Sequence, residues 1–373
     1  MPEESDLVTA IFELFLSILR RTLLASDAGP LGAIWKERCI GVRPYLRFNA
    51  RVDCRANELP FYKYNFGAAL AILDVCNELS ADPHFFPAVT FDAKPQSTRS
   101  EGAYAVRFVD YNVNSEDISV PIPDFSNDGR LTLFDHIFSM SCRFLALHEQ
   151  GHYFLGHLSY NERYNMTHEA AWLEAEEENV PGLSPSVARA LELQADRFAL
   201  DLLFLSGLRL RDEEAPPDRA FEDVHTFEEW LVKAAVGGLL VCGIFELSER
   251  ETKKAVDERA HPSAAARTIA LITSLRQVMV DHLASTTEAD RVLIEVVQNA
   301  QCLYRVLGVS PLAENAMHAW MNRDRCEDSA IDEYREAARL LRTMRPELKS
   351  YEALAHRPFG VTAPNIDADL LVE

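Results

Sequence analysis

The sequence predicts an α+β fold, mostly α, in which additional helices accompany a small sheet. Two observations favour this class. Long proline-free segments, 131–158 and 188–203, carry apolar residues at helical spacing. Short segments with alternating apolar and polar residues, typical of strands, gather in the first 130 residues. With 373 residues and 48% hydrophobic content, the chain can form one large domain or two closely packed ones.

The elements expected before residue 131 are two helices and several strands. Asp6 is a suitable cap for a helix over residues 7–24. Alternating apolar side chains predict a strand over residues 43–54. Further candidates are a helix over 65–80 and strands over 88–91, 103–111 and 118–122.

The chain after residue 203 is expected to be helical. The helix over Phe227–Leu247 contains the longest apolar stretch, which is shorter than the roughly 20 residues that span a bilayer. We therefore expect a buried helix and no membrane span. Several amphipathic helices are expected over Ala264–Leu354, with breaks at Gly308 and Pro346. Residues 355–373 are expected to form a loosely ordered tail.

Charge and cysteine content exclude some classes of protein. A formal net charge of −21 argues against a nucleic-acid partner, because phosphate binding needs clustered Lys and Arg. The same charge weakly favours basic substrates. Seven dispersed cysteines without a C-x-x-C pair predict reduced thiols, and the acidic start Met1–Asp6 is unlike a secretory signal. We therefore expect a cytoplasmic protein.

The segment His148-Glu-Gln-Gly-His152 matches the pattern H-E-x-x-H within the first long helix. Residues four apart lie on one face of a helix, so the imidazoles of His148 and His152 can occupy adjacent corners of a tetrahedral zinc site. Glu149 lies beside that face, where its carboxylate can reach a water on the metal without binding the metal itself. Buried structural histidines are the alternative interpretation.

A candidate third ligand lies on the second long helix, where Glu192 and Asp196 are four residues apart and share a face. We expect Glu192 to bind the metal and Asp196 to accept the remaining ring N–H of a ligating imidazole. The reverse assignment, with Asp196 as the ligand, stays open. A solvated acidic face is the other alternative, but the neighbouring residues are mostly apolar.

Three motifs together resemble one known family. His148-Glu-Gln-Gly-His-Tyr-Phe-Leu-Gly-His157 resembles the H-E-x-G-H-x-x-x-G-H signature of the CAAX prenyl endoprotease and HtpX-like gluzincin metallopeptidases. The segment Glu192-Leu-Gln-Ala-Asp-Arg-Phe-Ala199 is similar to the family's E-x-x-A-D-x-x-A helix. Arg259-Ala-His-Pro-Ser-Ala-Ala-Ala-Arg267 is similar to its H-P-S-x-x-x-R segment. The resemblance covers roughly residues 131–267.

The resemblance implies a zincin-like zinc metallopeptidase that acts on a peptide or protein substrate. It assigns zinc (Zn²⁺) to His148, His152 and Glu192, and makes Glu149 the general base. We expect the metal-binding helical core of the zincin in residues 131–283. The other expected parts are a mixed α/β region that supplies the sheet (1–130), carboxy-terminal helices (284–354) and the tail (355–373).

The same resemblance brings the His-Pro-Ser segment to the active site. His261 is then the expected catalytic group that stabilises the oxyanion, and Arg267 holds the local structure. Sequence alone leaves other oxyanion candidates, namely His225, Tyr160 and Tyr164. His157 stands at the wrong offset for a metzincin ligand and is interpreted as structural or as a support for a ligand.

Two features bear on how a substrate would bind. Pro121 suits an edge strand over 118–122, and zincins bind peptides alongside an edge strand that precedes the metal helix. An ordinary small sheet is the alternative. The acidic segment 174–178 is either a lid or, the better interpretation, a solvated run of charge.

Two alternatives to a peptidase remain. A catalytically inactive zincin could hold zinc and bind a peptide or partner without cutting it, although Glu149 would then have little purpose. A helical scaffold without metal is the other alternative. Members of the family are commonly integral membrane proteins, and this chain is not expected to be one. Their prenylated substrates are therefore not assumed here.

Overall fold

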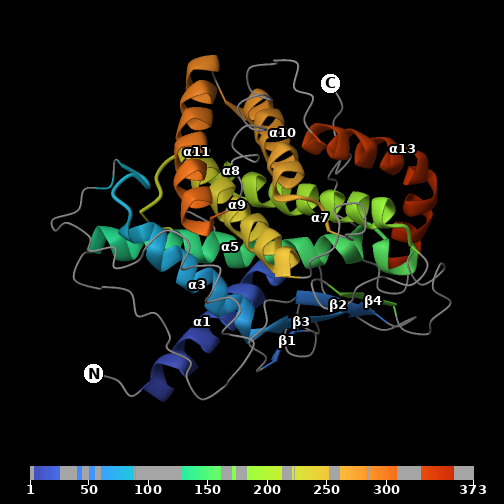
Figure 1. Cartoon of the computed structure of the whole chain (residues 1–373), viewed down its shortest axis with the longest axis horizontal. Coiled ribbons are helices and arrows are strands. Elements are labelled where there is room, and N and C mark those ends of the chain that lie inside the picture. Colours follow the sequence, from blue (N-terminus) through green and yellow to red (C-terminus); the bar gives the residue numbers. More distant parts are fainter. Residues whose placement is uncertain are drawn as a thin grey trace.

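The structure is a computed structural model that describes residues 4–25, 40–43, 50–54, 60–87, 89, 128–160, 170–173, 183–211, 221, 223–251, 261–283, 285–308 and 329–356. Helices dominate this part of the chain and a small sheet lies beside them (Figure 1), which confirms the α+β, mostly α class. The helices are α1 (Glu4–Ala25), α3 (Phe66–Ala81), α5 (Asp128–Phe154), α7 (Pro185–Leu205), α8 (Leu208–Arg211), α9 (Phe227–Glu251), α10 (Ala264–His282), α11 (Thr286–Leu307) and α13 (Ser329–His356).

The sheet has four strands in the order β1-β3-β2-β4. The strands are β1 (Ile40–Arg43), β2 (Ala50–Cys54), β3 (Phe61–Asn65) and β4 (Ala170–Leu173). β1 runs parallel to β3, and the other neighbours are antiparallel. Val52, Tyr62 and Tyr64 are buried, whereas the alternate residues Asp53 and Lys63 form an ion pair at a more exposed position. This alternation gives the sheet one apolar face, and β2 contacts α5.

Several expected elements differ from the structure. The strand predicted over 43–54 is represented by β1 and β2, and β3 was not expected at all. The sheet was expected to come only from residues 1–130. That expectation is wrong, because β4 lies between the two long motif helices and pairs with β2. Apart from Val89, the strands predicted over 88–91, 103–111 and 118–122 lie outside the described residues, as does the acidic segment 174–178.

The carboxy-terminal helices agree with the sequence at one expected break and differ at the other. Gly308 ends α11 in the left-handed conformation, with φ of 61°, as expected for a glycine at a helix end. The break predicted at Pro346 is wrong, because α13 continues through it. The buried side chains of Leu341, Met344 and Leu348 lie on both sides of the proline. Their packing keeps the helix continuous although the proline removes one backbone donor.

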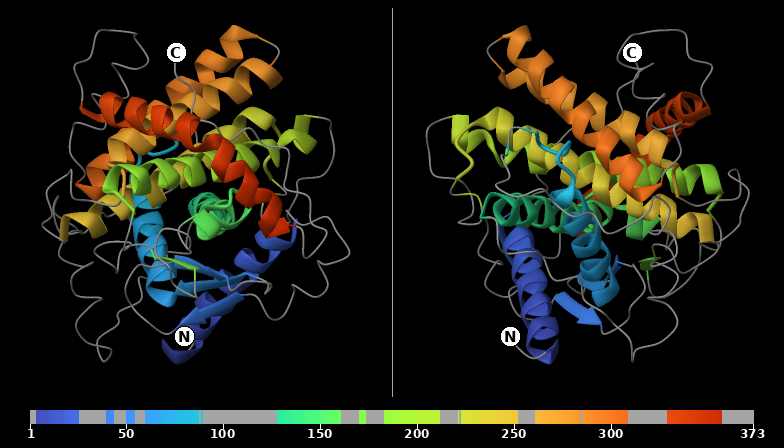
Figure 2. Two further views of the ribbon diagram at one scale, coloured as in Figure 1. Left: turned by 90° about the vertical axis from the view of Figure 1, so that its right-hand side faces the viewer. Right: turned by 60° about the vertical axis from the view of Figure 1, so that its left-hand side comes forward.

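Helix α5 lies at the centre of the structure. The left view of Figure 2 shows it end-on, with other helices and the sheet around it. It packs against α1, α3, α7 and α9, and every residue from His136 to Leu158 is buried. Buried polar side chains need partners, so those of α5 must be satisfied by its neighbours.

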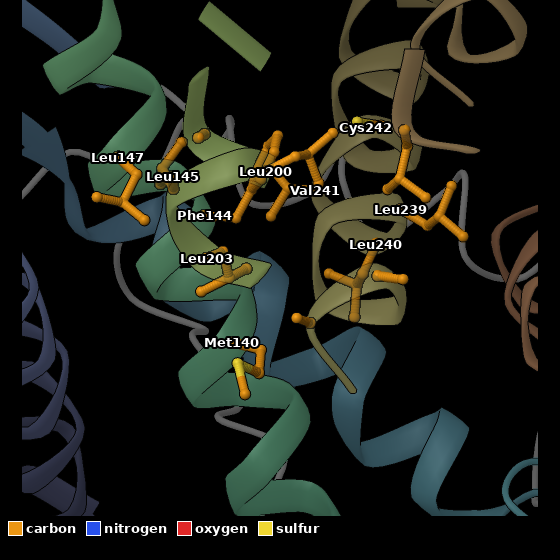
Figure 3. Close-up of a cluster of buried hydrophobic side chains, with 14 of the residues drawn as sticks. Met140, Phe144, Leu145, Leu147, Leu200, Leu203, Leu239, Leu240, Val241 and Cys242 are labelled. Carbon is orange, nitrogen blue, oxygen red and sulfur yellow. The ribbon is translucent and has the colours of Figure 1, made fainter. Parts of the chain in front are cut away.

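The core joins α5 to α7 and α9. Figure 3 shows Met140 and Phe144 of α5 beside Leu200 and Leu203 of α7 and side chains of α9 such as Leu240, all of them buried. Burial of a large apolar side chain contributes about 1.5–3 kcal/mol. These contacts therefore fix the spacing between the two helices that carry the sequence motifs.

One described helix is long and apolar enough to cross a membrane, namely α9 between Phe227 and Leu247. Of its most apolar window, 94% is buried inside the structure, which confirms the expected buried helix. A single helix of this kind is weak evidence for a membrane span, because core helices pass the same test.

The crossing of α9 over α5 leads to a stability prediction. A Cβ added at Gly237 would lie 2.6 Å from Met140 Cβ and 3.0 Å from the backbone of Ser141. We expect Gly237→Ala to reduce the free energy of unfolding by about 1–3 kcal/mol, because the backbone of α5 cannot move aside without cost. Urea unfolding followed by circular dichroism measures it. The control is Gly243→Ala on the same helix, which meets the flexible end of Leu307. Equal losses in both variants would contradict the prediction.

Candidate metal centre

The candidate site lies where α5 crosses α7. Gly151 of α5 faces α7, and a Cβ there would lie 3.2 Å from Ala195 Cα and 3.1 Å from Phe198 Cδ1. These distances are tighter than ordinary contacts between Cβ atoms and their neighbours. The glycine therefore allows the two helices to approach closely, which brings Glu192 within reach of the α5 histidines.

Two imidazoles and one carboxylate converge at this crossing. The Nε2 atoms of His148 and His152 are 3.1 Å apart. Glu192 places Oε2 3.3 Å from His148 Nε2 and Oε1 3.3 Å from His152 Nε2. All three side chains are buried, and among the described residues they form a group that could hold a metal ion.

The separations suit a tetrahedral ion. Two ligands that are each about 2.0–2.1 Å from a zinc ion lie about 3.3 Å apart when the geometry is tetrahedral. The two Nε2 atoms are 3.1 Å apart, and each lies 3.3 Å from one oxygen of Glu192, His148 from Oε2 and His152 from Oε1. One ligand atom from each of the three residues lies within 4.8 Å of the other two. Three protein ligands leave one corner of the tetrahedron for water or substrate. The residues present therefore fit a divalent cation.

Neighbouring groups set the tautomer of each imidazole. His148 Nδ1 lies 2.9 Å from Asp196 Oδ1, so the carboxylate favours a proton on Nδ1. His157 Nε2 donates to Gln194 Oε1 at 3.0 Å, which leaves His157 Nδ1 to accept from His152 Nδ1 at 2.9 Å. Burial, reinforced by the His152 imidazole, lowers the pKa of His157 to about 3, so its ring is neutral at pH 7. In the neutral tautomers that carry their proton on Nδ1, Nε2 of His148 and Nε2 of His152 each have a lone pair that could bind a metal.

Arg267 of α10 holds the two acidic side chains of α7. Its Nη1 donates to Asp196 Oδ1 at 2.7 Å and Oδ2 at 2.9 Å, and its Nη2 donates to Glu192 Oε2 at 3.3 Å. The guanidinium carbon lies over the ring of Phe245, 4.5 Å from its centre, in a cation–π contact. Burial would raise the pKa of Glu192, but His152, with the imidazoles of His148 and His261, holds that pKa well below its usual range.

Three carboxyl groups and one guanidinium are buried in this region, those of Glu149, Glu192, Asp196 and Arg267. Uncompensated buried charge is costly, by several kcal/mol for each ion. A divalent cation at the histidines would offset negative charge on the neighbouring carboxylates.

Of the two residues expected to act in catalysis, His261 approaches the cluster in space and Glu149 is the chain neighbour of one of its histidines. Glu149 is fully buried on α5, next to His148 in the chain. His261 precedes α10 and is 8% exposed, with Nδ1 3.6 Å from Glu192 Oε2. The structure thus brings His261, which is 69 residues further along the chain, to the carboxylate of Glu192. This distance identifies the segment before α10 as one wall of the site.

The remaining candidates occupy different positions. The carboxylate of Asp196 faces His148 Nδ1 and Arg267 on the side away from the two Nε2 atoms, which favours Glu192 as the third ligand. The Tyr160 hydroxyl donates to Met344 Sδ at 3.4 Å. His225 is exposed before the start of α9, and Tyr164 lies outside the described residues. These contacts leave His261 as the oxyanion candidate with a measured approach to the cluster.

Sequence reasoning did not find Gln194 or its bond to His157. The available signal was a lone amide between Leu193 and Ala195 on a helix with few exposed residues. A buried amide of this kind needs a hydrogen-bond partner, and a nearby histidine is a suitable one. The partner itself depends on how α7 lies against α5, which local sequence does not contain.

Comparison with known proteins does not extend these observations. No family model, no curated protein and no solved structure matches this chain. The resemblance to gluzincin metallopeptidases therefore rests on the three sequence motifs. What the structure adds is the side-chain cluster that those motifs form.

The pairing of Arg267 leads to a second stability prediction. In metal-free protein, Arg267→Met should reduce the free energy of unfolding by about 3–5 kcal/mol, because the carboxylates of Asp196 and Glu192 stay buried while the guanidinium that pairs with them is lost. Thermal unfolding in the presence of a chelator measures the loss. Arg276→Met, a half-buried position on the same helix, is the control and should cost much less. A similar loss in the two variants would show that the buried pairing is not what holds α10 to α7.

Proposed function

We propose that this chain is a zinc-dependent metallopeptidase of the gluzincin type, built on a zincin-like domain. The observation that carries the proposal is the convergence of three buried side chains: His148 Nε2 and His152 Nε2 are 3.1 Å apart, and each lies 3.3 Å from one carboxylate oxygen of Glu192. A buried carboxylate, Glu149, stands next to one ligand in the chain. Two imidazoles with one Glu ligand are a common ligand set of catalytic zinc in peptidases.

Zinc is the metal that this donor set favours. Imidazole suits several transition metals, but a tetrahedral group of two His and one Glu with one open corner is typical of catalytic zinc. When bound, zinc supplies a Lewis acid that polarises the peptide carbonyl and lowers the pKa of water towards about 7. His148, His152 and Glu192 would hold it, while Asp196 and His157 keep the two imidazoles in the required tautomers.

The chain's own residues then perform the proton transfers. The Glu149 carboxylate accepts a proton from the water whose oxygen attacks the peptide carbonyl carbon. The same carboxyl group delivers that proton to the amine that leaves when the C–N bond breaks. His261, on the wall formed before α10, donates a hydrogen bond to the developing oxyanion. The products are a carboxylic acid and an amine, so one water molecule is consumed for each bond cleaved.

The first test is the metal content of the purified protein. We expect about one zinc ion per chain in the wild type and a strong loss in Glu192→Ala, because two imidazoles alone hold the ion weakly. Asp196→Ala should keep zinc with an affinity that is lower by about 10- to 100-fold. Elemental mass spectrometry after dialysis measures all three proteins. Zinc kept in Glu192→Ala but lost in Asp196→Ala would reverse the two roles.

The second test separates a peptidase from a binding module. Glu149→Gln should reduce peptide hydrolysis by at least about 10²- to 10⁴-fold with zinc content unchanged, since the amide cannot accept the proton. Digestion of a peptide library, read by mass spectrometry, measures cleavage. Full activity in Glu149→Gln would reject this residue as the base. A wild type that binds zinc and peptides without cleaving any of them would support the inactive zincin instead.

A further inference from the structure

The position of His261 depends on the short segment that starts α10. Ser263 is the residue before the helix, and its Oγ accepts a hydrogen bond from Ala266 N at 3.1 Å. Pro262 lies between Ser263 and His261, and its ring fixes one backbone dihedral of this link. With one dihedral fixed, this short link has fewer ways to absorb a shift of Ser263 before it reaches His261.

A carboxylate from α13 holds Ser263 at two atoms. Ser263 Oγ donates to Glu333 Oε2 at 2.6 Å, and Ser263 N donates to Glu333 Oε1 at 3.2 Å. The two bonds fix both the side chain and the backbone of Ser263. Two-point attachment of this kind defines orientation as well as position.

The same carboxylate also reaches α7. Arg189 Nε lies 3.5 Å from Glu333 Oε1, and the two side chains are only 11% and 12% exposed. Arg189 is three residues before Glu192, so it lies about one turn from the candidate metal ligand on the same helix. α13 packs along α7 and α10, as the left view of Figure 2 shows. Glu333 therefore connects the helix that carries Glu192 to the segment that carries His261.

The start of α10 is held by a second carboxylate as well. Ala264 N donates to Glu246 Oε2 of α9 at 3.0 Å. Carboxylates are favourable at the amino-terminal end of a helix, where backbone N–H groups lack partners within the helix.

Burial raises the pKa of Glu333, while the bonds from Ser263 and the charge of Arg189 oppose that rise. Glu333 is thus a largely buried group whose bonds to Ser263 and ion pair with Arg189 link α13 to α10 and α7.

We propose that Glu333 is a positioning residue for His261, and that α13 is in this way a structural part of the active site. This assignment rests on the proposed peptidase function for its catalytic consequence, but not for its structural one. Glu333 lies outside the segment, roughly residues 131–267, that resembles the gluzincin family. It gives the carboxy-terminal helix a role that the sequence motifs do not contain.

The effect of Glu333 on the position of His261 is tested by a measurement that does not depend on enzyme activity. The side chains of histidine are labelled with ¹³C, and the resonance of His261 is identified by its loss in His261→Ala. Glu333→Gln, which removes the charge and one acceptor at nearly constant shape, should shift or broaden that resonance. Glu336→Gln, an exposed position one turn along α13, is the matched control and should leave it unchanged. Ser263→Ala removes the contact from the other side and should act as Glu333→Gln does, so the test does not depend on one variant.

The catalytic consequence is tested by a double-mutant cycle. Glu333→Gln should lower kcat by about 10- to 100-fold with zinc content and KM close to those of the wild type, because displaced catalytic groups lose this much. In the His261→Ala background the same substitution should have little further effect. If the two substitutions lower kcat by independent factors that multiply in the double variant, Glu333 does not act through His261.

The two ideas can fail separately. An unchanged His261 resonance in both Glu333→Gln and Ser263→Ala overturns the positioning role, whatever the enzyme does. A wild type that cleaves no peptide rejects the proposed function, while the resonance of His261 still decides whether Glu333 positions that side chain.

Discussion

The buried contact of one guanidinium with two carboxylates is the interaction on which the rest of the site depends. Arg267 binds Asp196 through two bonds and Glu192 through one, deep between α7, α9 and α10. A buried group of this kind stabilises only when its geometry is complete, since a lone charge at the same place would be costly. It therefore fixes the two acids of α7 before any ion is bound. The orientation of His148 follows, because Asp196 also faces its Nδ1.

Close packing of α5 against α7 brings the Glu192 carboxylate, which Arg267 holds in place, to the histidines of α5. The candidate ligands come from two helices, so the distance between the helix axes decides whether the three donor atoms can meet. Gly151 and Ala195 face each other at the crossing and permit the short distance. The apolar contacts of α5, α7 and α9 then hold it (Figure 3). Protein interiors are packed densely enough that such a spacing changes little without cost.

Local sequence predicted the features that depend only on spacing along one helix or on the backbone preference of one residue. His148 and His152 share a face because they are four residues apart, and the same rule places Glu192 and Asp196 together. Gly308 was predictable because only a glycine adopts its backbone conformation readily. The approach of Glu192 to His148 and His152 depends on how α5 and α7 cross. The bond of His157 to Gln194 depends on the same crossing. Only the resemblance of three motifs to a known family suggested that crossing from sequence.

The sequence was least informative where tertiary contacts override local preference. β3 and β4 are only five and four residues long, too short for alternation to be distinctive, and β4 gains its place by pairing with a strand about 120 residues earlier. The sequence predicts a break at Pro346 because proline disfavours helix interiors. Burial of residues on both sides of it outweighs that preference in α13. Figure 1 shows the helix changing direction along its length, as is usual where a proline interrupts the bonding.

The complete burial of the three candidate ligands would have a kinetic consequence. His148, His152 and Glu192 are each 0% exposed, so neither an ion nor a peptide reaches them from solvent in this conformation. Entry of an ion, its removal by a chelator and admission of a substrate would all require the surrounding chain to open. Local openings of this kind occur at rates set by the stability of the region that moves. The lifetime of a bound ion and the upper limit of turnover would then be governed by the same fluctuation.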